Sequence, residues 1–207
     1  MDGPGASQQL SYSSRASGHY LLLDHACSKC VACVAGWPVW CEQPTSGQPL
    51  CSVPEEFGSR TVVGLFGALS AFLAADVPSE AIVLAVAPAG DTLLRDFLTL
   101  AHSGSVLLTG DPWSPLAKEQ LADSSAFGRA DVVVSLLSGR DGVLAVRRGG
   151  TVCLGDASVA MPSVTELAQR EVRIVGPQDL AVGVKRFGSE TVEQVFERAR
   201  TVTMQVH

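Results

Sequence analysis

Apolar and polar positions alternate in blocks along the chain from residue 58 onward. Four apolar runs are as long as strands that are buried on both faces of a parallel sheet, and they cover residues 81–87, 105–109, 131–136 and 151–154. A shorter run at residues 172–175 predicts a fifth strand nearer an edge of the sheet. Because these runs alternate with amphipathic stretches, the pattern predicts an α/β domain built from βαβ units.

The stretches between the runs carry helix signals. Apolar residues recur at helical spacing over residues 92–101. Ser114 stands before a proline and predicts a helix start, because serine can cap and proline suits the first turn. Ser163 and Glu166 have the spacing of a capping box, and Ser189 can cap a last helix. One face of that last helix carries Val192, Val195, Phe196 and Ala199.

Two further features refine the predicted sheet. Gly149 and Gly150 predict the turn that precedes a strand. Between Leu107 and Asp131 there is room for only one helix and a loop, so a third strand is expected to be absent. The sequence therefore predicts a trimmed parallel sheet with helices on both faces.

The first 56 residues have a different character. Residues 1–18 are rich in Ser, Gly and Gln, which predicts a flexible leader. Residues 19–56 are rich in Cys, Pro and Trp with little regular periodicity, which predicts a small separate lobe. Residues 57–207 then form the α/β domain with its C-terminal helix.

Composition and charge indicate which classes of protein and which kinds of partner the sequence does not favour. Hydrophobic residues make up 46% and charged residues 17% of the 207 positions, which is enough for a buried core. The net charge of −6 repels phosphate backbones, so no nucleic-acid partner is expected. The longest nearly uncharged run, residues 61–75, is shorter than the roughly 20 apolar residues of a membrane-spanning helix. With no signal peptide, we expect a cytoplasmic protein whose cysteines are reduced unless a metal binds them.

The strongest chemical signal is a Cys-x2-Cys-x2-Cys-x7-Cys spacing, formed by Cys27, Cys30, Cys33 and Cys41. A Cys-x2-Cys step turns two thiolates toward one point about 4 Å apart, as tetrahedral zinc requires. Four sulfur ligands leave no open position for water or substrate, so such a site is structural. A small lobe without its own core gains its folding energy from the metal.

Disulfides, buried thiols and an iron–sulfur cluster are the alternatives to zinc at these cysteines. The absence of a secretion signal disfavours disulfides, and the even spacing disfavours chance burial. Closely spaced cysteines also ligate iron–sulfur clusters, but the seven-residue return loop favours zinc. Cys51 and Cys153 are not expected to be ligands, because Cys153 lies within a predicted strand.

This spacing and the apolar segment before it resemble the structural-zinc lobe of medium-chain, zinc-dependent alcohol dehydrogenases. The resemblance continues in the family's order over residues 76–84, 130–134, 146–152 and 170–176, and covers roughly residues 19–188. It implies a reduced Rossmann-like parallel sheet with helices on both faces, plus a small zinc-binding lobe with four cysteine ligands. It also implies that most of the family's N-terminal catalytic domain, with its catalytic zinc ligands, is missing before Cys27, so no catalytic residue is assigned.

The family's dinucleotide-binding loop also departs from its pattern here. Glycines at three positions allow a tight turn and close approach of the pyrophosphate. In the matching loop, residues 87–92, these three positions hold Ala87, Ala89 and Thr92, and Gly90 is the one glycine of the loop. Pro88 removes an amide donor, and Asp91 brings a negative charge toward the phosphates. Asp111, about 20 residues further on, stands where an acidic residue would bind the ribose hydroxyls of NAD; the alternative is an ordinary loop aspartate before Pro112. Gly90 and Asp111 are thus the candidate cofactor-binding residues, and NAD(P) stays an open alternative.

Two functions follow from these observations. In the first, the chain is a zinc-binding, shortened oxidoreductase of the alcohol-dehydrogenase type that acts on or binds a small molecule. In the second, it is a non-catalytic α/β module, stapled by structural Zn²⁺, that binds a partner protein or a metabolite. A homodimer is also expected, because the loss of a domain exposes apolar surface.

Overall fold

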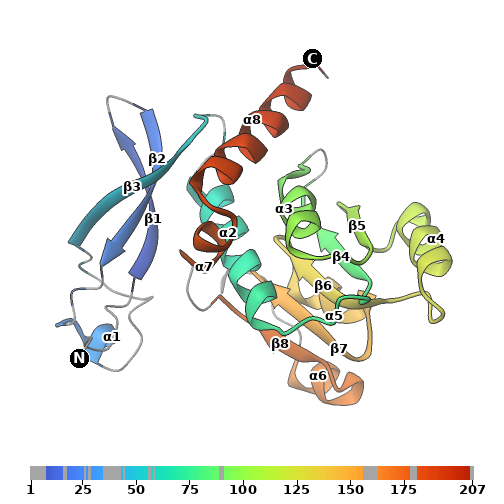
Figure 1. Cartoon of the computed structure of the whole chain (residues 1–207). Coiled ribbons are helices and arrows are strands. Elements are labelled where there is room, and N and C mark those ends of the chain that lie inside the picture. Colours follow the sequence, from blue (N-terminus) through green and yellow to red (C-terminus); the bar gives the residue numbers. More distant parts are fainter. Residues whose placement is uncertain are drawn as a thin grey trace.

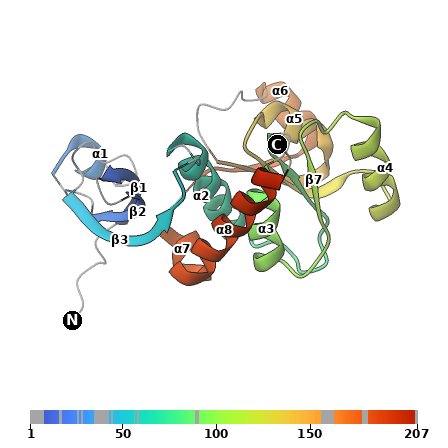
Figure 2. The same ribbon diagram turned by 90° about the horizontal axis from the view of Figure 1, so that it is seen from above.

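A computed structural model of the chain shows two sheets and eight helices among its described residues, which are 8–15, 18–25, 27, 29–34, 43, 45–55, 57, 59–88, 91–155, 163–177 and 181–205. The smaller sheet lies to one side of the larger α/β body (Figure 1). Seen from above, this sheet and helix α4 lie at opposite ends of the molecule (Figure 2).

The smaller sheet is antiparallel and has the order β1-β2-β3, with β1 at Gln8–Arg15, β2 at Gly18–His25 and β3 at Thr45–Val53. The prediction of a flexible leader is therefore wrong for residues 8–15. These residues pair along their whole length with β2, so their backbone groups are bonded despite a polar composition. The local sequence pattern does not indicate that these residues pair with a neighbouring strand.

The larger sheet is parallel, with five strands in the order β5-β4-β6-β7-β8. The strands are β4 (Val83–Val86), β5 (Val106–Thr109), β6 (Ala130–Ser135), β7 (Val146–Leu154) and β8 (Arg173–Val175). All five predicted strands are confirmed, with β8 at an edge. Only α4 lies between β5 and β6, so this fully described stretch holds no further strand, as predicted, and β5 forms the other edge.

One detail of β7 differs from its prediction. Gly149 and Gly150 lie inside this strand rather than in a turn before it. Pairing with β6 shifts register here, because Val146 pairs with Ala130 and Thr151 with Val132. Gly149 has a positive φ of 72°, which glycine adopts without steric cost, so the strand continues through an irregularity.

The helices follow the strands in alternation. They are α1 (Val31–Val34), α2 (Ser59–Ala74), α3 (Leu93–Ala101), α4 (Pro115–Ser124), α5 (Gly139–Ala145), α6 (Val164–Arg170), α7 (Ala181–Phe187) and α8 (Ser189–Gln205). The Ser114 side chain accepts from the Ala117 amide, and Ser163 and Glu166 form the predicted capping box. The predicted apolar face of α8 is buried.

Helices cover both faces of the parallel sheet. On one face, α2, α3 and α8 contribute large buried side chains such as Phe66, Phe97 and Phe196. On the other face, residues of α4, α5 and α6 pack against Leu84, Val133 and Val152. The sheet is thus the middle layer of a three-layer α/β fold, which confirms the predicted class.

Helix α2 approaches the sheet unusually closely. A Cβ atom at Gly67 would lie 2.1 Å from the Gly155 carbonyl oxygen, and one at Gly155 would lie 2.2 Å from the Gly64 carbonyl oxygen. The two backbones therefore meet where no side chain fits. This helix contains most of the long uncharged run, and it is buried in protein. Among the described residues, no helix has the length and apolarity needed to cross a membrane.

A charged contact joins the small sheet to α8. The Ser52 amide and hydroxyl both donate to Glu193 Oε1, at 2.7 and 3.1 Å. Cys51 and Val53, on either side of Ser52, are buried in the same core cluster as α2 and α8. The small sheet is therefore anchored to the α/β body through β3.

Candidate functional sites: a cysteine cluster and the carboxyl edge of the sheet

Three of the four predicted metal ligands come together in the structure. Cys27 and Cys30 follow the end of β2, and Cys33 lies on the single turn of α1. Their sulfur atoms all lie within 4.8 Å of one another, and Cys27 Sγ is 3.9 Å from Cys33 Sγ. Cys41 lies outside the described residues.

The geometry of the cluster suits a tetrahedral thiolate site. Ligands about 2.3 Å from zinc in a tetrahedron are roughly 3.8 Å apart, close to the Cys27–Cys33 separation. The amides of Lys29 and Cys30 point at Cys27 Sγ, at 3.4 and 3.3 Å. Hydrogen bonds of this kind stabilise negative charge on a ligating sulfur. The cluster could therefore hold a metal ion.

The other two described cysteines are core residues, as predicted for Cys153. Cys51 and Cys153 are both buried, and burial raises the pKa of each thiol to about 12. The charge of Glu193 adds to the rise at Cys51, whereas the charge of Arg173 opposes it at Cys153. Thiols with such pKa values stay protonated at neutral pH and do not act as nucleophiles.

The second candidate site lies at the carboxyl edge of the parallel sheet, in the loop between β4 and α3. Asp91 makes two hydrogen bonds within this loop. Its amide donates to the Pro88 carbonyl at 3.0 Å, and its Oδ1 accepts from the Leu93 amide at 3.0 Å. A carboxylate of the chain therefore already bonds the first amide of α3. Gly90, the candidate glycine of this loop, lies outside the described residues.

The start of α3 is also strongly acidic. Burial raises the pKa of the Asp91 carboxyl above its ordinary value, the hydrogen bond from Leu93 opposes the rise, and the charge of Asp96 adds to it. Asp96 lies in the first turn and accepts from the Thr92 hydroxyl at 3.1 Å. The positive end of the helix dipole thus already faces two carboxylates.

Asp111 lies at the carboxyl end of β5, as predicted, but it closes a turn. Its Oδ1 accepts from the Trp113 amide at 2.8 Å, and its carbonyl accepts from the Thr109 hydroxyl and the Ser114 amide. This is the ordinary use of an aspartate in a tight turn before a helix.

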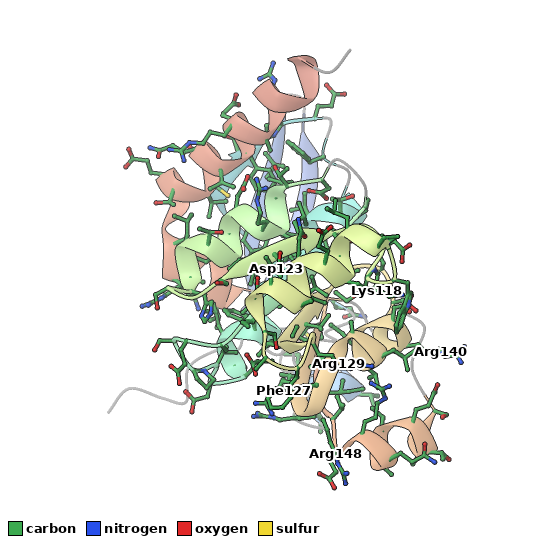
Figure 3. The ribbon with its side chains drawn as sticks, turned by 90° about the vertical axis from the view of Figure 1, so that its right-hand side faces the viewer. Lys118, Asp123, Phe127, Arg129, Arg140 and Arg148 are labelled. Carbon is green, nitrogen blue, oxygen red and sulfur yellow. The ribbon has the colours of Figure 1, made fainter. Side chains whose placement is uncertain are left out.

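Trp113 bridges two loops of the carboxyl edge. Its indole Nε1 lies 3.3 Å from Oδ1 of Asp141, which is in the first turn of α5, and the Lys118 ammonium lies 5.8 Å from its ring centroid. The loop after β5 is thereby joined to the start of the helix that follows β6. Figure 3 shows Lys118 and Arg140, near the starts of α4 and α5, toward the same side of the molecule.

Comparisons with known proteins agree with this architecture. No protein-family model and no curated protein matched the sequence. An alcohol dehydrogenase from Thermus sp. ATN1 superposes with a TM-score of 0.53 at 10% identity, over 97% of this chain and 88% of that chain. The chain therefore has a Rossmann-like α/β fold.

Two further structures are similar at lower scores. A structure described as a zinc-binding dehydrogenase from Sinorhizobium meliloti 1021, bound to NADP, has a TM-score of 0.49 at 14% identity, over 96% of this chain and 68% of that chain. An acetophenone reductase from Geotrichum candidum, in complex with NAD, has a TM-score of 0.45 at 16% identity, over 88% of this chain. The chain spans 63% of that reductase, less than two thirds of its length.

The described residues at the start of α3 do not suit the pyrophosphate of a dinucleotide. In a Rossmann-like fold, the pyrophosphate binds at the amino end of the helix that follows the first strand of the sheet, here α3. The amides of Asp91 and Leu93 are bonded within the chain, and the carboxylates of Asp91 and Asp96 repel phosphate. The Asp111 carboxylate, expected to meet a ribose, is engaged in a turn.

Two side-chain contacts could not be predicted from the sequence, one at the amino edge of the sheet and one at its carboxyl edge. The ring of His102 is buried at the end of α3, and its Nε2 lies 2.7 Å from the Ala81 carbonyl oxygen. Trp113 has a partner, Asp141, that lies 28 residues away, and no spacing rule connects them. Each group depends on the folded sheet for its partner.

Proposed function

We propose that this chain is a non-catalytic, zinc-stapled module on a dehydrogenase fold, which binds a small molecule or a partner protein without nicotinamide chemistry. Zinc would be held by Cys27, Cys30, Cys33 and Cys41. The three described sulfurs support this assignment through their mutual distances and the amides directed at Cys27. With four thiolates the ion supplies a cross-link and no open coordination position, so its role is structural.

The observation that carries the non-catalytic part is the Asp91 carboxylate at the start of α3. It accepts from the Leu93 amide, one of the donors that a pyrophosphate would otherwise engage. The amino end of the α3 dipole would attract phosphate, but an ionised Asp91 carboxylate at that end repels it. Hydride transfer to or from NAD(P) needs the cofactor in place, so the loss of this subsite argues against it.

The second candidate is an NAD(P)-linked oxidoreductase of the alcohol-dehydrogenase type. The fold favours it, and so does the position of Asp111 at the carboxyl end of β5. The loop between β4 and α3 argues against this candidate, because the Asp91 side chain would have to move away from the start of α3 before a phosphate could bind there.

Titration of the purified chain with NADH and NADPH by calorimetry separates the two. The non-catalytic proposal predicts no binding in the micromolar range for a sample whose thermal melt shows a folded protein. A micromolar Kd for either nucleotide would overturn the proposal and favour the oxidoreductase. Asp96→Asn serves as a matched variant, because removing one of two carboxylates is expected to leave binding undetectable while Asp91 stays in place.

A further inference from the structure

A cavity lies at the opposite, amino edge of the parallel sheet. It has a volume of about 310 Å³ and lies between the starts of β6, β7 and β8 and the connection from α2 to β4. Its floor is formed by the buried residues Ala75, Ala81 and Val132. At roughly 30 Å³ for each water, this space suits a ligand of about ten non-hydrogen atoms, far smaller than a dinucleotide.

One charged pair in this cavity is already neutralised. Asp131 accepts from the Arg147 guanidinium through Oδ1 and from the Ile82 amide through Oδ2, the latter at 2.8 Å. Both carboxylate oxygens thus have partners, and the pair ties β6 to β7 and β4. This pair therefore lines the cavity without offering an unpaired charge to a ligand.

The remaining charges face the cavity from two different walls. On β8, the Arg173 guanidinium makes one long hydrogen bond, 3.4 Å to the Ala75 carbonyl oxygen. On the α2–β4 connection, the Asp76 carboxylate makes no hydrogen bond or ion pair with any described residue, and Glu80 accepts only from the neighbouring Ser79 hydroxyl. Arg173 forms no ion pair with either carboxylate within the described part of the chain, so these charges are not paired with one another.

Asp76 is also held in an uncommon backbone conformation. Its φ of 52° is in the left-handed region, one of two such non-glycine residues that the structure describes. Aspartate and asparagine adopt this region more readily than most residues, at a modest energetic cost. Asp76 lines the cavity from this backbone conformation.

We propose that this cavity binds a small zwitterion of the α-amino-acid type, with its carboxylate on Arg173 and its ammonium group on Asp76. A guanidinium presents a planar pair of donors that matches a carboxylate, and a carboxylate is the natural partner of an ammonium group. Beyond the Asp131–Arg147 pair, one positive and two negative charges remain, which favours a basic amino acid over an acidic one. This inference names a ligand for the proposed binding role and rests on it in that respect.

The test is a thermal-shift and calorimetric titration of the full chain with L-lysine, L-alanine and L-glutamate. Acetate and ethylamine serve as probes that carry only one of the two charged groups. We expect lysine to bind most tightly, then alanine, then glutamate, with acetate and ethylamine at least about tenfold weaker than alanine. Failure of all three amino acids to bind, or acetate binding as tightly as alanine, would overturn the proposal.

Two cavity variants and one control sharpen the result. Arg173→Gln and Asp76→Asn are each expected to weaken lysine binding at least about tenfold, because each removes one charge-assisted contact. Asparagine keeps the left-handed backbone, so Asp76→Asn preserves the fold. Arg148→Gln is the control: Arg148 pairs with Glu171, does not line the cavity and lies at the lower margin of Figure 3. Unchanged binding in both cavity variants would overturn the proposal, whereas the separate NADH titration tests the non-catalytic role.

Discussion

The contact between α2 and the sheet makes a quantitative prediction from two glycines on one helix. Gly64 and Gly67 both lie within α2, so replacing either by alanine gains the same helix propensity, about 0.5–1 kcal/mol. A Cβ at Gly64 meets nothing within 4 Å, whereas one at Gly67 lies 2.1 Å from the Gly155 carbonyl oxygen. The Gly67→Ala variant can be accommodated only if the helix backbone moves away from β7.

That movement disturbs the main core cluster, because α2 carries fully buried side chains such as Phe66 and Leu69. Overpacking of this kind costs about 1–3 kcal/mol. After the propensity gain is subtracted, we expect Gly67→Ala to lower Tm by up to about 10 °C for a chain of this size, and Gly64→Ala to leave it unchanged or raise it slightly. Urea unfolding of both variants beside the wild type measures the difference. Equal stability of the two variants would refute the close approach of α2 to Gly155.

Three other substitutions test separate contacts. Arg170 donates to the carbonyl of Leu144 at the end of α5, at 3.2 Å, so Arg170→Gln is expected to lower the free energy of unfolding by about 1 kcal/mol in urea. Burial raises the folded-state pKa of Asp91 above its ordinary value of 3.8, so ionisation costs stability above that raised pKa. Asp91→Asn should hence be at least as stable as the wild type at pH 7. As the pH falls through the raised pKa, the free energy of unfolding of the wild type should increase relative to that of the variant. A difference between the two that does not change with pH would contradict this. Glu193→Gln weakens the two hydrogen bonds from Ser52, so limited proteolysis is expected to release the small sheet sooner, whereas an unchanged cleavage rate argues against that anchor.

The parallel sheet could be predicted from the sequence because its strands are buried on both faces. Such strands appear as unbroken apolar runs, and residues 81–87 and 131–136 needed no other signal. The antiparallel sheet could not be predicted in this way. Polar residues predominate in Gln8–Arg15, and its pairing with β2 is visible only in the folded structure.

The candidate sites, too, could be predicted from the sequence only where their residues lie close together along the chain. Three cysteines close in sequence could be assigned to one cluster, because the spacing itself brings their sulfurs together. The sequence marks Asp91 as an unfavourable charge, but its bond to the Leu93 amide depends on the side-chain conformation. The amino-edge cavity joins Asp76 to Arg173, nearly a hundred residues apart, and no local pattern indicates such a pair.

One zinc ion bound by the cysteine cluster is the central expectation of this account. Native mass spectrometry of the purified chain, combined with elemental analysis, measures it directly. We predict one zinc per chain, lost in the Cys30→Ser variant and retained when the buried Cys153 is replaced by alanine. A chain that is folded and carries no zinc, or that keeps its zinc after Cys30→Ser, would contradict the account.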